Sequence, residues 1–166
     1  MTGTNLNRLN VRHASVSDMP YLMSLERACA TAAHWNDDRY RELLSFGERL
    51  VLVAEEKGKA RGKTIGQPGP AILGFLVARQ VAAEWELENI VVAPASRRLG
   101  IGKRLLDALV ARAREAGGEA VFLEVRESNA AARKLYEKAG FGLTGRRKSY
   151  YCDPVEDAIL YRKALE

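Results

Sequence analysis

The alternation of hydrophobic and polar positions changes period along the chain, and each period predicts a kind of element. A start signal at Ser17-Asp18 and Pro20, followed by apolar residues at helical spacing, predicts a helix that ends near Cys29. A second short helix is predicted to begin after Asn36 or Asp37, because the next apolar residues fall on one face. Shorter apolar runs predict strands at residues 9–14, 50–54, 71–81 and 85–92.

The second half of the chain continues with a helix, a strand, a helix and two strands. The helix opened by Gly100 has an apolar stripe at helical spacing, formed by Ile101, Leu105, Leu106, Leu109 and Ala113. A strand at residues 122–125 leads to a helix that Ser128 or Asn129 can cap and that Gly140 closes after Lys138. The last of the predicted strands covers residues 158–162.

The mixed order of helices and strands predicts the fold class. Residues 56–70 are rich in Gly, Lys and Pro, and we expect a long exposed loop there, with strands close on both sides. The sequence contains no internal repeat and no low-complexity segment. We therefore predict an α/β (α+β) fold, a single domain over residues 1–166 with a central mixed sheet.

Composition narrows the class of protein further. The chain has 166 residues, of which 47% are hydrophobic and 28% charged, which is an ordinary soluble composition. No apolar run is long enough for a membrane span and the start lacks the apolar region of a signal peptide, so we expect a cytoplasmic protein. The two cysteines are too few for a disulfide framework or a zinc site. The net charge of +5 suits an anionic partner, either nucleic acid or a phosphorylated cofactor.

Positive charge and glycine gather at the start of one predicted helix, in a segment that we call the Gly-Arg turn (residues 97–104). Orphan amides at a helix start attract anions, and glycines let phosphate oxygens approach the backbone. Basic residues are unfavourable at this end of a helix, which favours a bound anion over a chance cluster. The spacing fits neither a P-loop nor a dinucleotide fingerprint, because Arg97 and Arg104 replace two P-loop positions and Leu105 replaces the third glycine.

The hexamer Arg97-Arg98-Leu99-Gly100-Ile101-Gly102 resembles the (Gln/Arg)-x-x-Gly-x-(Gly/Ala) signature of the GNAT acetyltransferase superfamily. The resemblance implies that acetyl-CoA is the cosubstrate, without a metal, and that the sheet is mostly antiparallel and splayed between two central strands to admit it. It implies a cofactor site made of Ile90, Val91, Val92, Arg97, Arg98, Leu99, Gly100, Ile101, Gly102, Lys103 and Asn129.

A second block, LEVRESNAAARKLYEKAGF at residues 123–141, resembles the other hallmark of this superfamily at nearly every position. Asn129 and Tyr136 stand seven residues apart, about two turns of one helix face. The block and the later Arg146-Arg147, Tyr150-Tyr151 and Glu156-Asp157-Ala158 pattern resemble the branch that acetylates the N-terminal alanine of ribosomal proteins. The sequence departs from that branch in residues 56–70 and at Glu88, where an apolar residue is more usual.

The resemblance implies catalytic roles for Glu124 and Tyr136. Glu124 would take the proton of the attacking amine, and Tyr136 would donate a proton to the departing thiolate. Glu86 and Glu88 are rival bases on a neighbouring strand. From the residues alone, Glu124 could equally be the solvent-facing residue of a strand and Tyr136 a half-buried anchor. An exposed polar strand edge explains Glu86 and Glu88 as well.

The resemblance also implies an acceptor: the α-amine of a protein N-terminus, most simply alanine on a ribosomal protein. Six residues are candidates for binding it: Glu26, Trp35, Glu86, Glu88, Tyr150 and Tyr151. We expect a monomer or weak homodimer, with no membrane and no direct nucleic-acid partner.

The alternative functions are a small-molecule acetyltransferase for a polyamine, aminoglycoside or amino acid, a non-catalytic acetyl-CoA-binding protein, and a nucleic-acid-binding module. The sequence shows no metal-ligand spacing.

Overall fold

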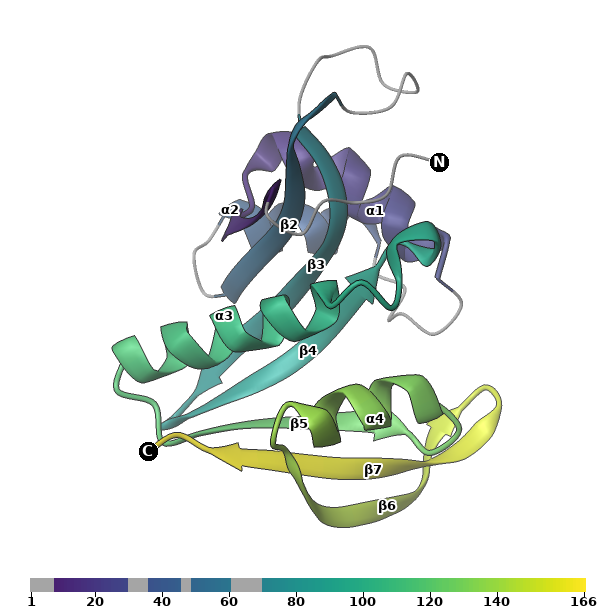
Figure 1. Ribbon diagram of the computed structural model, residues 1–166. Coiled ribbons are helices and arrows are strands. Elements are labelled where there is room, and N and C mark those ends of the chain that lie inside the picture. Colours follow the sequence, from purple (N-terminus) through teal and green to yellow (C-terminus); the bar gives the residue numbers. More distant parts are fainter. Residues whose placement is uncertain (1–7, 30–35, 46–48, 61–69) are drawn as a thin grey trace. The chain divides into compact units, whose positions relative to one another are not determined.

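The computed structural model describes residues 8–29, 36–45, 49–60 and 70–166. Within these ranges the strands form a seven-stranded sheet in the order β1-β2-β3-β4-β5-β7-β6 (Figure 1). The strands are β1 (Leu9–His13), β2 (Arg49–Ala60), β3 (Pro70–Val81), β4 (Glu84–Val92), β5 (Ala120–Arg126), β6 (Gly142–Cys152) and β7 (Val155–Ala164). The helices are α1 (Met19–Arg27), α2 (Asp37–Ser45), α3 (Ile101–Glu115) and α4 (Ala130–Lys138), with short 3-10 turns at Val16–Asp18 and Pro94–Ser96.

Both strand directions occur in the sheet, as predicted. β1 pairs with β2, β5 with β7 and β6 with β7 in antiparallel fashion, whereas β4 and β5 are parallel. The parallel pair is joined by α3, the kind of crossover that parallel strands require. Its ladder runs over only four residue pairs, from Glu84↔Ala120 to Leu87↔Leu123. The family resemblance predicts that the two central strands separate beyond such a ladder.

The described residues group into two compact units. Unit 1 comprises the chain up to residue 77 together with residues 89–105, and unit 2 comprises residues 78–88 and 106–166. Strands β3 and β4 and helix α3 contribute residues to both units.

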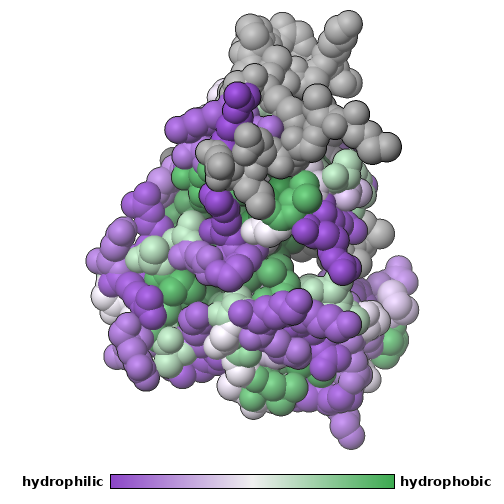
Figure 2. Space-filling view, viewed as in Figure 1, coloured by the Kyte–Doolittle hydropathy of each residue, from purple (hydrophilic) through white to green (hydrophobic). Residues whose placement is uncertain are grey.

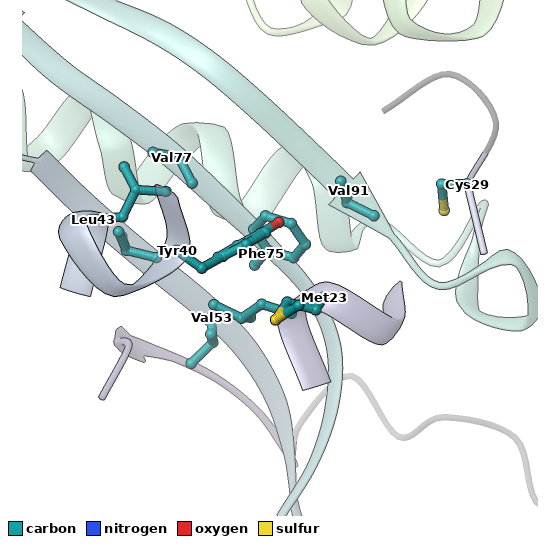
Figure 3. Close-up of a cluster of buried hydrophobic side chains, with 10 residues drawn as sticks. Met23, Cys29, Tyr40, Leu43, Val53, Phe75, Val77 and Val91 are labelled. Carbon is teal, nitrogen blue, oxygen red and sulfur yellow. The ribbon is translucent and has the colours of Figure 1, made fainter. Parts of the chain in front are cut away.

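The core of unit 1 is an apolar cluster between α1, α2 and the strands (Figure 3). Met23 comes from α1 and packs near Val53 of β2. Tyr40 of α2 meets Phe75 of β3 edge to face, with ring centroids 6.4 Å apart. The apolar faces of both short helices are therefore the ones that the sequence pattern predicts.

The sheet of unit 2 has one apolar face and one polar face. Tyr161 of β7 contacts Tyr136 of α4, with ring centroids 6.1 Å apart, and stands opposite Leu123 of β5. Because side chains alternate along a strand, the buried residues Val121, Leu123 and Val125 of β5 face α4. The intervening residues Phe122 and Glu124 share the opposite face with Glu86 of β4. Hydrophilic side chains cover the outer side of α4 (Figure 2).

The structure corrects the loop predicted at residues 56–70. Strand β2 continues to Ala60 and β3 begins at Pro70, while residues 61–69 lie outside the described ranges. The ladder with β1 reaches as far as Glu56, the first residue of the predicted loop. Glu55 is buried and accepts a hydrogen bond of 2.8 Å from Nε of Arg12, and Glu56 stands opposite Leu9. In the described part of the chain, no helix is both long and apolar enough to cross a membrane.

Candidate active site

The Gly-Arg turn in unit 1 has the backbone geometry of an anion site. Arg98 and Gly100 both have positive φ, 66° and 78°, which turns the chain sharply before α3 begins at Ile101. The backbone N of Arg104 donates to the carbonyl of Gly100 at 3.1 Å, so the helical ladder starts there. The earlier amides of the first turn have no partner within the helix, and the helix dipole adds positive potential.

Space around Gly100 fits a ligand. A Cβ built on Gly100 meets no heavy atom within 4 Å, so conformation rather than crowding favours glycine here. Arg98, Lys103 and Arg104 have exposed side chains beside it, whereas Gly102 and Ile101 are buried. The turn therefore offers open space, amides and cations together, which suits a pyrophosphate.

The end of β4 is held by side chains of unit 1. Arg97 donates from Nε to the carbonyl of Val92 at 3.3 Å and from Nη2 to Sγ of Cys29 at 3.3 Å. The Cys29 thiol also donates to the Val92 carbonyl at 3.7 Å. Val91 is buried in the core, and Ile90 is half-buried. The Val92 carbonyl, expected to face the cofactor, thus already has partners within the chain.

In unit 2, a carboxylate and aromatic rings meet on the polar face of the sheet. Glu124 forms an ion pair with Arg147, with 3.1 Å between Oε1 and Nε. The hydrogen bond to Glu124, and then burial, raise the pKa of the Tyr150 hydroxyl above its usual value. The Arg147 guanidinium lies over the Tyr150 ring, 5.4 Å from its centroid. Tyr151 meets Tyr150 edge to face at 5.2 Å. Glu124, Tyr150 and Tyr151, predicted separately, are therefore neighbours.

A bulge in β6 follows Arg147, which pairs with Ala158 of β7, and includes Tyr150. The register shifts between Arg147 and Tyr151, and Ser149 has a φ of 51°. The carboxylate of Asp157 holds the bulge, because it accepts hydrogen bonds from the Ser149 amide at 2.8 Å and from Arg146 at 3.0 Å. The Ser149 amide and Arg146 lower the pKa of Asp157 in spite of the opposing cost of burial. Asp157 is thus part of the hairpin that presents Tyr150.

Glu86 and Glu88, the rival bases, share one arginine. Arg79 approaches Glu86 at 2.6 Å and Glu88 at 3.5 Å. Farther along the same face, Glu84 pairs with Arg162 at 2.6 Å. Each of these carboxylates therefore has a guanidinium partner.

Tyr136 lies on the apolar side of this sheet. Only 5% of its surface is exposed, and its ring packs edge-on against Phe141 at 6.0 Å. Burial, with a smaller effect of Tyr151, raises its pKa well above the usual range for a phenol. A phenol is protonated at neutral pH even at its ordinary pKa, so this hydroxyl carries the proton that a donor requires.

Other predicted residues have structural partners or lie outside the described ranges. The Asn129 side chain caps α4 by accepting a hydrogen bond of 3.2 Å from the Ala132 amide. Glu26 is 2% exposed and accepts a hydrogen bond of 3.2 Å from Asn89 in unit 1. Trp35 falls among the residues that the structure does not describe.

Sequence reasoning assigned no site role to three arginines of unit 2: Arg79, Arg126 and Arg147. Arg126 lies over the Tyr151 ring, 4.2 Å from its centroid, and pairs with Glu156 at 3.2 Å. Arg79 and Arg147 pair with the candidate bases. Arg147 belongs to the Arg146-Arg147 pair noted in the sequence. A register shift in β6 between Leu143 and Gly145 breaks the alternation that would have shown on which face of the sheet Arg147 lies. Within the described ranges, no group of His, Cys, Asp or Glu side chains is arranged to hold a metal.

Comparison with known proteins establishes the family to which the chain belongs. Residues 19–141 match the family model described as the Acetyltransferase (GNAT) family. The chain belongs to this family and is an acyltransferase, which confirms the resemblance seen in the two sequence blocks.

Within the family, the chain is similar to ribosomal protein bS18-alanine N-acetyltransferases. The enzyme of that name from Escherichia coli K12 is 42% identical over 147 residues, 87% of this chain and 89% of the relative. The one from Haemophilus influenzae is 45% identical over 83 residues, which cover 56% of that relative. The crystal structure of the Escherichia coli ribosomal-protein-S18-alanine N-acetyltransferase has a TM-score of 0.78 at 28% identity, covering 95% of this chain and 94% of that one.

The fold is also that of NAA60 from Arabidopsis thaliana, solved in complex with acetyl-CoA. That structure has a TM-score of 0.83 at 18% identity, covering 95% of this chain and 98% of the other.

Proposed function

We propose that the protein transfers an acetyl group from acetyl-CoA to the α-amine of an N-terminal alanine, on a ribosomal protein. The cluster of Glu124, Tyr150 and Tyr151 on the polar face of unit 2 carries this proposal. It combines a carboxylate, which can accept a proton, with hydroxyl groups that can hydrogen-bond a peptide. The named relatives, similar over nearly the whole chain, support alanine as the first residue.

The Gly-Arg turn would hold the pyrophosphate of acetyl-CoA. Its first-turn amides and the exposed side chains of Arg98 and Lys103 supply donors and positive charge, and the open space at Gly100 lets the phosphates approach. The cosubstrate supplies an acetyl thioester, which a neutral amine can attack. Asn129 caps α4 through its side-chain oxygen, and its amide group remains the part of that side chain able to donate to the cosubstrate.

The remaining chemistry is proton transfer by side chains of unit 2. An α-amine has a pKa of about 8 and a lysine amine one of about 10.4, so an N-terminus requires the weaker base. Glu124 takes the amine proton. The buried hydroxyl of Tyr136, which is neutral at pH 7 as any phenol is, donates a proton to the thiolate.

The proposal includes the compartment, the kind of acceptor and the assembly state of the enzyme. Cys29 and Cys152 are free thiols, which is usual in a reducing compartment, and we place the reaction in the cytoplasm. The acceptor is a protein, and the enzyme acts as a monomer or weak homodimer without contacting nucleic acid.

A set of matched acceptors tests the proposal. Peptides that differ only in the first residue (Ala, Ser or Met) are incubated with acetyl-CoA, alongside spermidine, and the products are measured by mass spectrometry. The alanine peptide should react fastest, because a small first side chain meets least hindrance. Faster turnover of spermidine would replace the proposal with a small-molecule acetyltransferase.

A further inference from the structure

Glu124 and Tyr150 form a site for a cation, and a side chain of the protein fills it. The carboxylate of Glu124 and the face of the Tyr150 ring both contact the Arg147 guanidinium, at 3.1 Å and 5.4 Å. A carboxylate beside a ring face is the arrangement that binds ammonium groups as well as guanidinium groups. The α-ammonium of an acceptor peptide has the same charge and similar donors.

The Arg147 side chain is held weakly enough to leave. Of its side-chain surface, 56% is exposed, whereas that of Glu124 is 19% exposed. An exposed ion pair contributes little to stability, since water and salt compete with it. The other nearby carboxylate, Glu86, has its own partner in Arg79 at 2.6 Å. Arg147 is therefore the described cation that contacts Glu124.

We propose that Arg147 occupies the acceptor-amine position of the free enzyme and competes with the incoming N-terminal ammonium for Glu124. The amine displaces the guanidinium, which moves into solvent, and then gives its proton to the carboxylate released from the pair. Arg147 thereby lowers the affinity for the acceptor, and amines that bind weakly do not displace it. This inference rests on the proposed function, because it takes Glu124 as the group that meets the amine.

Steady-state kinetics on the alanine peptide test the competition. Arg147→Met removes the charge and keeps a flexible chain, so KM for the peptide should fall by roughly two- to fivefold, as loss of a weak exposed pair predicts. kcat should not fall in parallel. Arg147→Lys, which keeps a cation near Glu124, should restore a KM close to that of the wild type.

Arg162→Met is the matched control, because Arg162 pairs with Glu84 on the same sheet face at 2.6 Å. Its KM should equal that of the wild type. An unchanged or raised KM in Arg147→Met overturns the inference, since it means that Arg147 is passive or that it binds the peptide itself. A wild-type enzyme that turns over no α-amine peptide overturns the proposed function instead.

Discussion

At the scale of the residue, Glu124 shows how much one position on a strand reveals. Its alternation with Leu123 and Val125 predicts the face on which it lies, and the structure places it on the polar face of unit 2. The alternation says nothing about its partners. Arg147 and Tyr150 reach Glu124 from β6, more than twenty residues away along the chain.

Replacement of Glu124 tests its role as base. Glu124→Gln keeps the size and polarity of the side chain but removes the proton acceptor, so kcat should fall by about 10²-fold or more. Peptide turnover, followed by release of free CoA, measures this. Glu84→Gln is the control, because Glu84 lies on the same face and pairs with a different arginine, Arg162. Equal activity in both variants and the wild type would move the base elsewhere.

At the scale of the element, the Gly-Arg turn allows a test in which binding should be lost while folding changes little. Gly100→Asp adds a carboxylate at the start of α3, where the helix dipole favours it and where no atom stands within 4 Å of a new Cβ. The positive φ costs roughly 1 kcal/mol for a residue with a side chain. The same carboxylate would repel a pyrophosphate, so thermal stabilisation by CoA should be lost.

Gly100→Asn separates the effect of charge from that of shape. Asparagine tolerates positive φ and nearly matches aspartate in size, so this variant should keep most of the stabilisation by CoA in thermal unfolding. If Asp and Asn behave alike, charge at the turn does not determine binding, and the assignment of the pyrophosphate to this turn is wrong.

At the scale of the whole molecule, the order of elements could be predicted because each has a strong local signal. Pro20, Asn129 and Gly140 mark helix ends by mechanisms that act within a few residues, and the structure confirms α1 and α4 at these places. Periodicity within α3 and β5 is equally local. These features need no knowledge of the remainder of the chain.

The parts that escaped prediction depend on contacts between distant segments. Strand β2 includes the buried residues Glu55 and Glu56 because β1 pairs with both of them, which composition cannot show. The bulge in β6 depends on Asp157 of β7, and Glu26 is buried through Asn89, sixty-three residues later. The roles of Glu124 and Tyr136 came from resemblance to the family, since the local pattern alone left simpler explanations open.

The central claim is that the acceptor is an α-amine rather than a lysine, and one peptide can test it. The peptide has a free N-terminal alanine and one internal lysine, so both amines face the enzyme at equal concentration. After limited reaction with acetyl-CoA, fragmentation in the mass spectrometer locates the added acetyl group. Acetylation should occur almost wholly on the alanine, because its lower pKa leaves more neutral amine at pH 7 and Glu124 alone suffices as base. Acetyl groups found mainly on the lysine would contradict the account.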